Sequence, residues 1–176
     1  VVYLILLGAP GAGKGTQADT LCRELNLVHI ASGDLFREAV SAGTALGKQA
    51  KAFMERGLLV PDDITISLIR EKIIGLGSGK GVLLDGFPRT LEQARALDKD
   101  LEGQGTKVDR AVYIKASEAE LLRRLSGRWI CRQCQAPYHM QSAPPKAAGK
   151  CDKCGGELYQ RADDTAETVK KRLEVY

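Results

Sequence analysis

Gly8-Ala9-Pro10-Gly11-Ala12-Gly13-Lys14-Gly15-Thr16 follows the apolar run 1–7 and opens a stretch with helical character. Glycines let backbone N–H groups turn inward around phosphate oxygens. The first turn of a helix adds free N–H donors and the positive end of its dipole. The order of strand, loop, lysine and helix predicts a phosphate-binding loop in which Lys14 reaches the β- and γ-phosphates of a nucleotide.

This loop departs from the general motif at one position. Gly15 stands where serine or threonine is usual, so we expect Thr16 to supply the hydroxyl near magnesium. The alternative interpretation is a glycine-rich turn that binds nothing. The correct order of all four parts favours the phosphate loop.

Length and composition indicate one globular unit. The chain has 176 residues, 44% of them hydrophobic and 27% charged, with a formal net charge of +4. No apolar run approaches the roughly 18 to 20 residues that cross a bilayer. The run 1–7 has no basic leader or small-residue cleavage site, so we expect a buried strand and a cytoplasmic protein without a membrane partner. The charge is too mild to indicate nucleic-acid binding.

Strands and helices are expected to alternate along the chain. Apolar stretches predict strands at 28–30, 81–85 and 111–115, besides the first. Helical spacing, together with capping and terminating residues, predicts helices over 17–25, 34–40, 45–56, 64–74, 91–101 and 119–125. This order predicts an α/β fold, a parallel sheet with helices on both faces, whose ligands gather at the carboxyl ends of the strands. Thr90 with Gln93, and Ser117 with Glu120, resemble capping boxes.

Four cysteines in two pairs form the second strong motif. Cys131-x-x-Cys134 and Cys151-x-x-Cys154 are separated by sixteen residues, which suits two knuckles that close one structural zinc site. A pair of disulfides is the alternative, and four thiolates also accept iron or cobalt. His139 could replace a cysteine, although packing or hydrogen bonding suits it better. The fifth cysteine, Cys22, is expected to be a buried thiol.

The motifs together resemble the adenylate kinase family, in its long-lid, zinc-containing bacterial type. They cover nearly the whole chain in family order: Gly8 to Thr16, Ser32-Gly33-Asp34 with Arg37, Asp85 to Thr90 with Gln93, Arg124 with Gly127-Arg128, and Arg161 to Asp164 with Arg172. The resemblance implies a P-loop nucleoside monophosphate kinase fold that transfers a phosphoryl group reversibly from MgATP to AMP, giving two ADP. It divides the chain into a core (1–30, 61–126 and 165–176), an AMP-binding flap (31–60) and a zinc-knuckle lid (127–164).

The resemblance also implies roles for single residues. Catalysis is assigned to Lys14, Arg89, Arg124, Arg128, Arg161 and Arg172. The ATP site, with its magnesium, comprises Gly11, Ala12, Gly13, Lys14, Gly15, Thr16, Asp85, Arg128, Tyr138 and His139. The AMP site comprises Ser32, Arg37, Leu58, Leu59, Val60, Gly86, Phe87, Arg89, Gln93, Arg161 and Arg172. Zinc is assigned to Cys131, Cys134, Cys151 and Cys154. Arginine suits this chemistry because its planar fork grips phosphate oxygens and stays charged.

Some points depart from the family or leave alternatives open. Ser32 stands where threonine is common, which keeps the hydroxyl. The family continues beyond position 176 with one more strand and a helix, so we expect those elements to be lacking here. A monomer is expected. The alternatives are a kinase for UMP or CMP, a zinc-ribbon nucleic-acid-binding ATPase, and a nucleotide sensor without catalysis.

Overall fold

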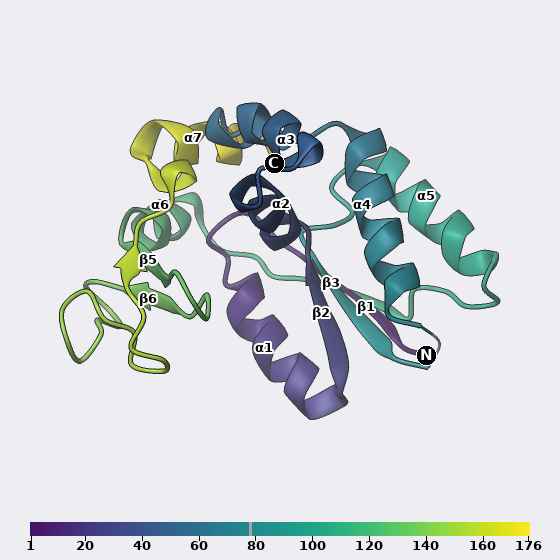
Figure 1. Cartoon of the computed structure of the whole chain (residues 1–176), viewed down its shortest axis with the longest axis horizontal. Helices are drawn as coiled ribbons and strands as arrows, with labels where there is room; N and C mark the ends of the chain where they lie inside the picture. Colours follow the sequence, from purple (N-terminus) through teal and green to yellow (C-terminus); the bar gives the residue numbers. More distant parts are fainter. Residues whose placement is uncertain (78) are drawn as a thin grey trace.

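A four-stranded parallel sheet forms the centre of the computed structural model, which describes residues 1–77 and 79–176 (Figure 1). Its strands are β1 (Tyr3–Leu7), β2 (Leu27–Ala31), β3 (Gly81–Asp85) and β4 (Arg110–Tyr113), in the order β2-β3-β1-β4. Ile5 aligns with Leu84 on one side and with Ala111 on the other. The expected α/β fold is confirmed, although the last strand ends two residues earlier than the sequence predicted.

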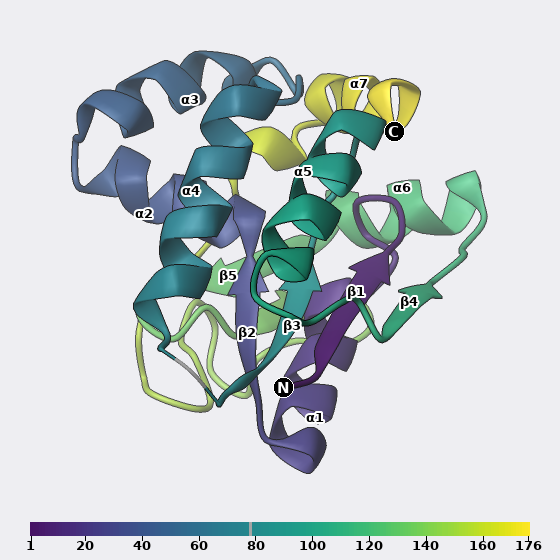
Figure 2. The ribbon, with the colours of Figure 1, turned by 90° about the vertical axis from the view of Figure 1, so that its right-hand side faces the viewer.

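Each face of this sheet is covered by helices, as Figures 1 and 2 show. Side chains alternate along β1: Tyr3 and Ile5 pack in the main core with α4 (Asp62–Gly75) and α5 (Leu91–Glu102). Leu6 packs on the other face with Ala18 of α1 (Lys14–Leu25). Cys22 lies at the border of this second cluster and is half-buried, not fully buried as predicted.

The two expected capping boxes form only in part. Thr90 accepts a hydrogen bond from the Gln93 backbone N–H at 3.2 Å, and Ser117 accepts one from Glu120 at 3.4 Å. In place of the reciprocal bonds of a capping box, the Gln93 and Glu120 side chains make other hydrogen bonds. The Gln93 side chain accepts from the Arg89 backbone, and Glu120 of α6 (Glu118–Ser126) pairs with its own helix's arginines.

Helices α2 (Ser32–Ser41) and α3 (Ala45–Glu55) form a small unit with its own apolar cluster. Both helices end before a glycine with positive φ, as the sequence predicted: 66° at Gly43 and 70° at Gly57. At Gly47, an added Cβ would lie 2.0 Å from the Ala39 carbonyl oxygen. The two helices therefore approach closely because this position has no side chain.

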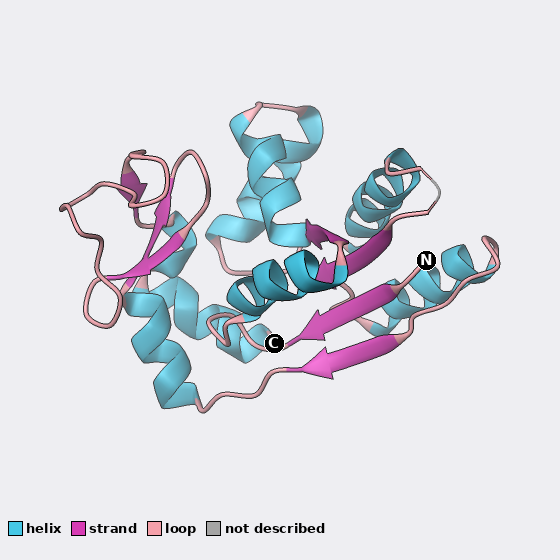
Figure 3. Cartoon of the chain, turned by 90° about the horizontal axis from the view of Figure 1, so that it is seen from below, coloured by secondary structure: helices cyan, strands magenta, loops and turns pink. Residues whose placement is uncertain are grey.

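A second, antiparallel sheet lies on the left of Figures 1 and 3, on the side of the molecule opposite α5. Its strands are β5 (Arg128–Cys131), β6 (Pro137–His139) and β7 (Leu158–Tyr159), in the order β6-β5-β7. No pattern in the sequence predicted these short strands. After β7, a short 3₁₀ helix (Ala162–Asp164) and α7 (Ala166–Val175) bring the chain back over α6 to the main sheet. None of the described helices is long and apolar enough to cross a membrane.

Candidate active site

The predicted phosphate loop lies between the end of β1 and the start of α1. Gly13 precedes the helix with a φ of 100°, a left-handed conformation that favours glycine. The Lys14 ammonium folds back over the loop and donates to the carbonyl oxygens of Gly8 (2.7 Å) and Ala9 (3.1 Å). Of the other loop residues predicted at ATP, Ala12 is buried, Gly11 and Gly13 are half-buried, and Gly15 and Thr16 are exposed on the first turn of α1.

The electrostatics of Lys14 set it apart from an ordinary lysine. Burial lowers its pKa to about 8, and the positive charges of Arg89, Arg172 and Arg128 act in the same direction. Asp85 opposes them. Neighbouring positive charges therefore destabilise the Lys14 ammonium, and an anionic ligand would stabilise it.

Asp85 lies at the carboxyl end of β3, with one carboxylate oxygen 3.9 Å from the position a Cβ would take at Gly15. Its partner is His29 of β2, at 3.4 Å between Nε2 and Oδ2. Burial opposes protonation of His29, but the hydrogen bond and charge of Asp85 outweigh it and raise the histidine pKa. Sequence reasoning missed His29, because its closeness to Asp85 arises only from the pairing of β2 with β3.

A cavity of about 470 Å³ opens at the carboxyl ends of the strands. Tyr176 lies at its wall, and Figure 2 shows the C-terminus at the end of α7. Most of the residues predicted at AMP line this cavity together with Lys14: Ser32, Arg37, Leu58, Leu59, Val60, Gly86, Arg89, Gln93 and Arg172. Two residues of the predicted set, Phe87 and Arg161, are not in the lining of this cavity. Phe87 is buried in the main core, and the Ser32 hydroxyl donates to the Gly86 carbonyl at 2.7 Å.

An arginine cluster borders the cavity. Arg161 lies within 3.6 Å of the Asp34 carboxylate, which Arg37 also contacts. Burial lowers the pKa of Arg161 to about 10, with Arg37 and Arg128 adding to the effect. The Nε atoms of Arg37 and Arg161 are buried, and neither has a hydrogen-bond partner within the described residues. Buried donors normally have partners, and an anionic ligand would supply them for these two atoms.

Three further arginines near this cluster contact neighbouring elements. Arg128 of β5 forms a two-pronged pair with Asp164, at 2.8 and 2.5 Å, and Arg172 of α7 reaches the same carboxylate at 3.1 Å. Arg124 donates to the Ala12 carbonyl at 3.2 Å. Arg124 therefore touches the phosphate loop, while Arg128 ties the small sheet to α7.

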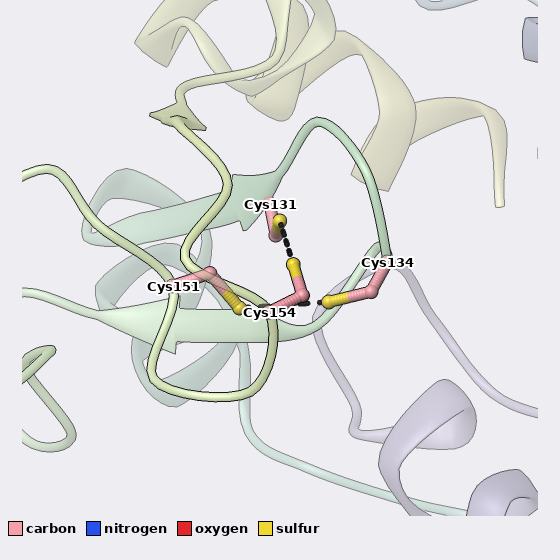
Figure 4. A group of neighbouring side chains, drawn as sticks. All are labelled: Cys131, Cys134, Cys151 and Cys154. Carbon is pink, nitrogen blue, oxygen red and sulfur yellow. Dashed lines mark hydrogen bonds between the residues drawn. The ribbon is translucent and has the colours of Figure 1, made fainter.

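The four cysteines of the two knuckles converge, as Figure 4 shows. Their sulfur atoms all lie within 4.8 Å of one another, and no disulfide joins them in the part of the chain that the structure describes. A tetrahedral zinc with Zn–S bonds of about 2.3 Å needs sulfurs about 3.8 Å apart. The Cys131–Cys154 and Cys134–Cys151 distances of 3.4 and 3.5 Å suit such a site after a small expansion.

Tyr138 and His139, predicted at ATP, have other neighbours in this structure. The Tyr138 hydroxyl lies 3.3 Å from Cys151 Sγ and accepts from the Asp152 backbone N–H at 2.7 Å. His139 Nδ1 accepts from the backbones of Gln141 and Ser142, while Nε2 lies 3.1 Å from the Arg123 carbonyl. Neither side chain lines the cavity.

The fold and the site together define a class of protein: a P-loop kinase with a cavity for a small phosphorylated substrate at the strand ends. The family model described as adenylate kinase matches residues 6–176. The chain belongs to the adenylate kinase family, whose reaction is phosphoryl transfer between ATP and AMP.

Curated relatives agree over almost the full chain. It is 57% identical over 173 residues to the adenylate kinase of Dehalococcoides mccartyi, and 54% identical over 173 residues to that of Caldicellulosiruptor bescii. Each alignment covers 98% of this chain and 80% of the relative. The adenylate kinase of Bacillus cytotoxicus is 53% identical over 172 residues, with the same coverage.

Proposed function

We propose that the chain transfers the terminal phosphoryl group of MgATP to AMP, giving two ADP, and that the residues brought together at the strand ends carry the reaction. The observation that supports this best is the cavity lined by Lys14, Arg37 and Arg172, beside which the buried Nε atoms of Arg37 and Arg161 have no hydrogen-bond partner among the described residues. Phosphoryl transfer needs mainly in-line positioning, charge neutralisation and exclusion of water, and such a cationic cavity can supply all three.

The donor side of the site is assigned to the phosphate loop. The backbone of 11–16 and Lys14 hold the ATP phosphates, and Arg124 contributes from α6. Magnesium bound with ATP would neutralise phosphate charge; Asp85 and Thr16 are the residues placed to hold it through its water shell. The closeness of Asp85 to the start of α1 supports this fit. Asp85 is not needed as a base, since the AMP phosphate is already an anionic nucleophile.

The acceptor side is assigned to the cavity. Arg37 and Arg89 grip the AMP phosphate, and Ser32, the backbone at 58–60 and the turn at Gly86 surround the nucleoside, with Gln93 at the adenine edge. Arg128, Arg161 and Arg172 surround the transferring group. Phe87 acts through the core, and Tyr138 and His139 act by supporting the lid.

We propose further that residues 31–60 form a movable AMP flap and 127–164 a movable lid, carried by the core of 1–30, 61–126 and 165–176. Closure of both would exclude water, and opening would limit turnover. The cysteine cluster holds structural zinc, with no open position for chemistry. The chain acts as a monomer in the cytoplasm, where free thiols persist.

A coupled assay of ADP formation from MgATP tests this function, with AMP, UMP, CMP and GMP offered in turn. We expect turnover with AMP far above the other acceptors. Arg89→Met should lower kcat/KM for AMP by at least 100-fold, whereas Arg95→Met, an exposed position on α5, should change it less than twofold. Higher turnover with UMP or CMP than with AMP would identify that nucleotide as the acceptor. Nucleotide binding without turnover would favour a nucleotide sensor.

A further inference from the structure

The side chain of Gln93 is held in one orientation by two neighbours of opposite hydrogen-bonding character. Its Oε1 accepts from the Arg89 backbone N–H at 2.7 Å, and its Nε2 donates to Asp62 Oδ1 at 2.7 Å. A backbone N–H can only donate and a carboxylate can only accept, so rotation of the amide by 180° would create two mismatches. At 1% exposure, no water is at hand to relieve them.

The second carboxylate oxygen of Asp62 is also held by a hydrogen bond. The Thr90 hydroxyl donates to Asp62 Oδ2 at 2.7 Å and accepts from the Gln93 backbone N–H at 3.2 Å. Asp62 lies in the first turn of α4, and Thr90 caps α5. The closed chain Thr90–Asp62–Gln93 therefore spans two helices and ends at a side chain that lines the cavity.

We propose that Asp62 is a specificity-determining positioning residue: by fixing the polarity of the Gln93 amide, it makes the acceptor site select adenine over a 6-oxo purine. This rests on the proposed function, in which Gln93 meets the base of the acceptor nucleotide. With one N–H and one oxygen lone pair committed, Gln93 retains one N–H and one lone pair for the base. Adenine presents the acceptor N1 beside the donor N6, and hypoxanthine presents the donor N1–H beside the acceptor O6.

The two bases thus require opposite orientations of the same amide. Adenine pairs with Gln93 as it is held, while hypoxanthine requires the rotated amide, which faces an oxygen toward Asp62 and an N–H toward Arg89. Removing the Asp62 carboxylate removes one of those two mismatches. Discrimination against IMP then falls, although every group that touches the nucleotide is still present.

Dissociation constants of AMP and IMP, measured by calorimetry on the whole chain, test this proposal without depending on turnover. Asp62→Ala should strengthen IMP binding about tenfold, because one of the two mismatches of the rotated amide is gone, and leave AMP within twofold, so that the ratio of the two constants falls about tenfold. The ATP constant should stay within twofold. In Asp62→Asn, the new side-chain oxygen can still accept from Gln93 if the asparagine nitrogen turns to the Thr90 hydroxyl. This variant should therefore retain the ratio of the AMP and IMP dissociation constants within threefold.

Asp63→Ala is the matched control, since Asp63 is the exposed neighbour in the same first turn of α4 and carries the same charge. It should leave all three constants within twofold. An unchanged AMP-to-IMP ratio in Asp62→Ala, with AMP still bound, overturns the role of Asp62 and leaves the proposed function intact. Failure of the unaltered chain to bind AMP overturns both. Should Asp62→Ala not fold, Thr90→Val, which frees the second oxygen of Asp62, must show the same shift to a smaller extent.

Discussion

Lys14 illustrates at the scale of one residue how a binding site can hold unfavourable charge in readiness for a ligand. Its pKa of about 8 lies below the 10.5 of an ordinary lysine, chiefly through burial. The unfolded chain therefore binds the proton more tightly than the folded one. Between pH 8 and 10.5 the free energy of unfolding should rise with pH through this group, because the buried charge is then lost.

Polyphosphate should reverse that shift. We expect ATP binding at pH 8 to raise the Lys14 pKa again and to take up about half a proton per chain. Calorimetric titration in two buffers of different ionisation enthalpy measures the uptake directly. Lys14→Met should abolish it, while Lys48→Met, at an exposed position on α3, should retain it. Equal heats for the unaltered chain in both buffers would contradict the assignment of Lys14 to the donor phosphates.

At the scale of elements, the lid depends on its cysteines because its apolar cluster is very small. The buried members are Cys131, Ala136, Cys151 and Leu158, with Trp129 and Tyr138 packed against them. Two of these are metal-ligand candidates themselves. So few apolar side chains cannot offset the conformational entropy of nearly forty ordered residues, so we expect bound metal to supply most of the stability of the lid.

Removal of the metal should therefore loosen the lid and leave the main sheet folded. We expect the zinc-loaded protein to hold about one zinc per chain by elemental analysis. Chelation, or Cys154→Ser, should lower the thermal midpoint and direct limited proteolysis to 127–164. Cys22→Ser, a cysteine outside the cluster, should keep both the metal and the midpoint. Equal midpoints for metal-free and zinc-loaded chains would contradict a structural role for the metal.

For the whole molecule, local signals in the sequence predicted most of what local interactions determine. The phosphate loop, the glycines that end α2 and α3, and strand β3 are all set by nearby residues, and they appear where expected. Pairings between distant segments were not predictable. The strand order, the closeness of His29 to Asp85 and the pairing of β5 with β7 all depend on contacts between residues at least 27 positions apart, such as Cys131 and Leu158, which no periodicity reports.

The candidate site shows the same division. Motif spacing identified Lys14, Arg37 and Gln93, which do line one cavity. It could not foresee that the Gln93 amide would be committed to Asp62, or that Tyr138 would lie at Cys151, because both depend on side-chain packing between elements. The expected capping box at Thr90 formed only in part, because the Gln93 oxygen accepts from the backbone of Arg89 and its Nε2 donates to Asp62 of another helix.

Asp164 is the residue through which the lid and the core are joined, and it provides a test of that coupling. Its side chain has no solvent exposure and pairs with Arg128 of β5 and Arg172 of α7. Removing one member of a buried ionic network leaves the others uncompensated, at a cost of about 3 to 5 kcal/mol. We expect Asp164→Asn to lower the free energy of unfolding in urea by about 3 kcal/mol, near the lower end of that range, because asparagine keeps one oxygen as an acceptor.

Asp164→Asn should also loosen the lid under conditions in which the core stays folded. Proteolysis within 127–164 should quicken, while the zinc content stays at the level of the unaltered chain, because the cysteine cluster lies beyond the broken contact. Asp98→Asn on the exposed face of α5 is the control for the loss of one negative charge. If the two variants unfold at the same urea concentration, Asp164 does not join the lid to the core, and the closed arrangement must depend on the neighbouring contact of Arg161 with Asp34.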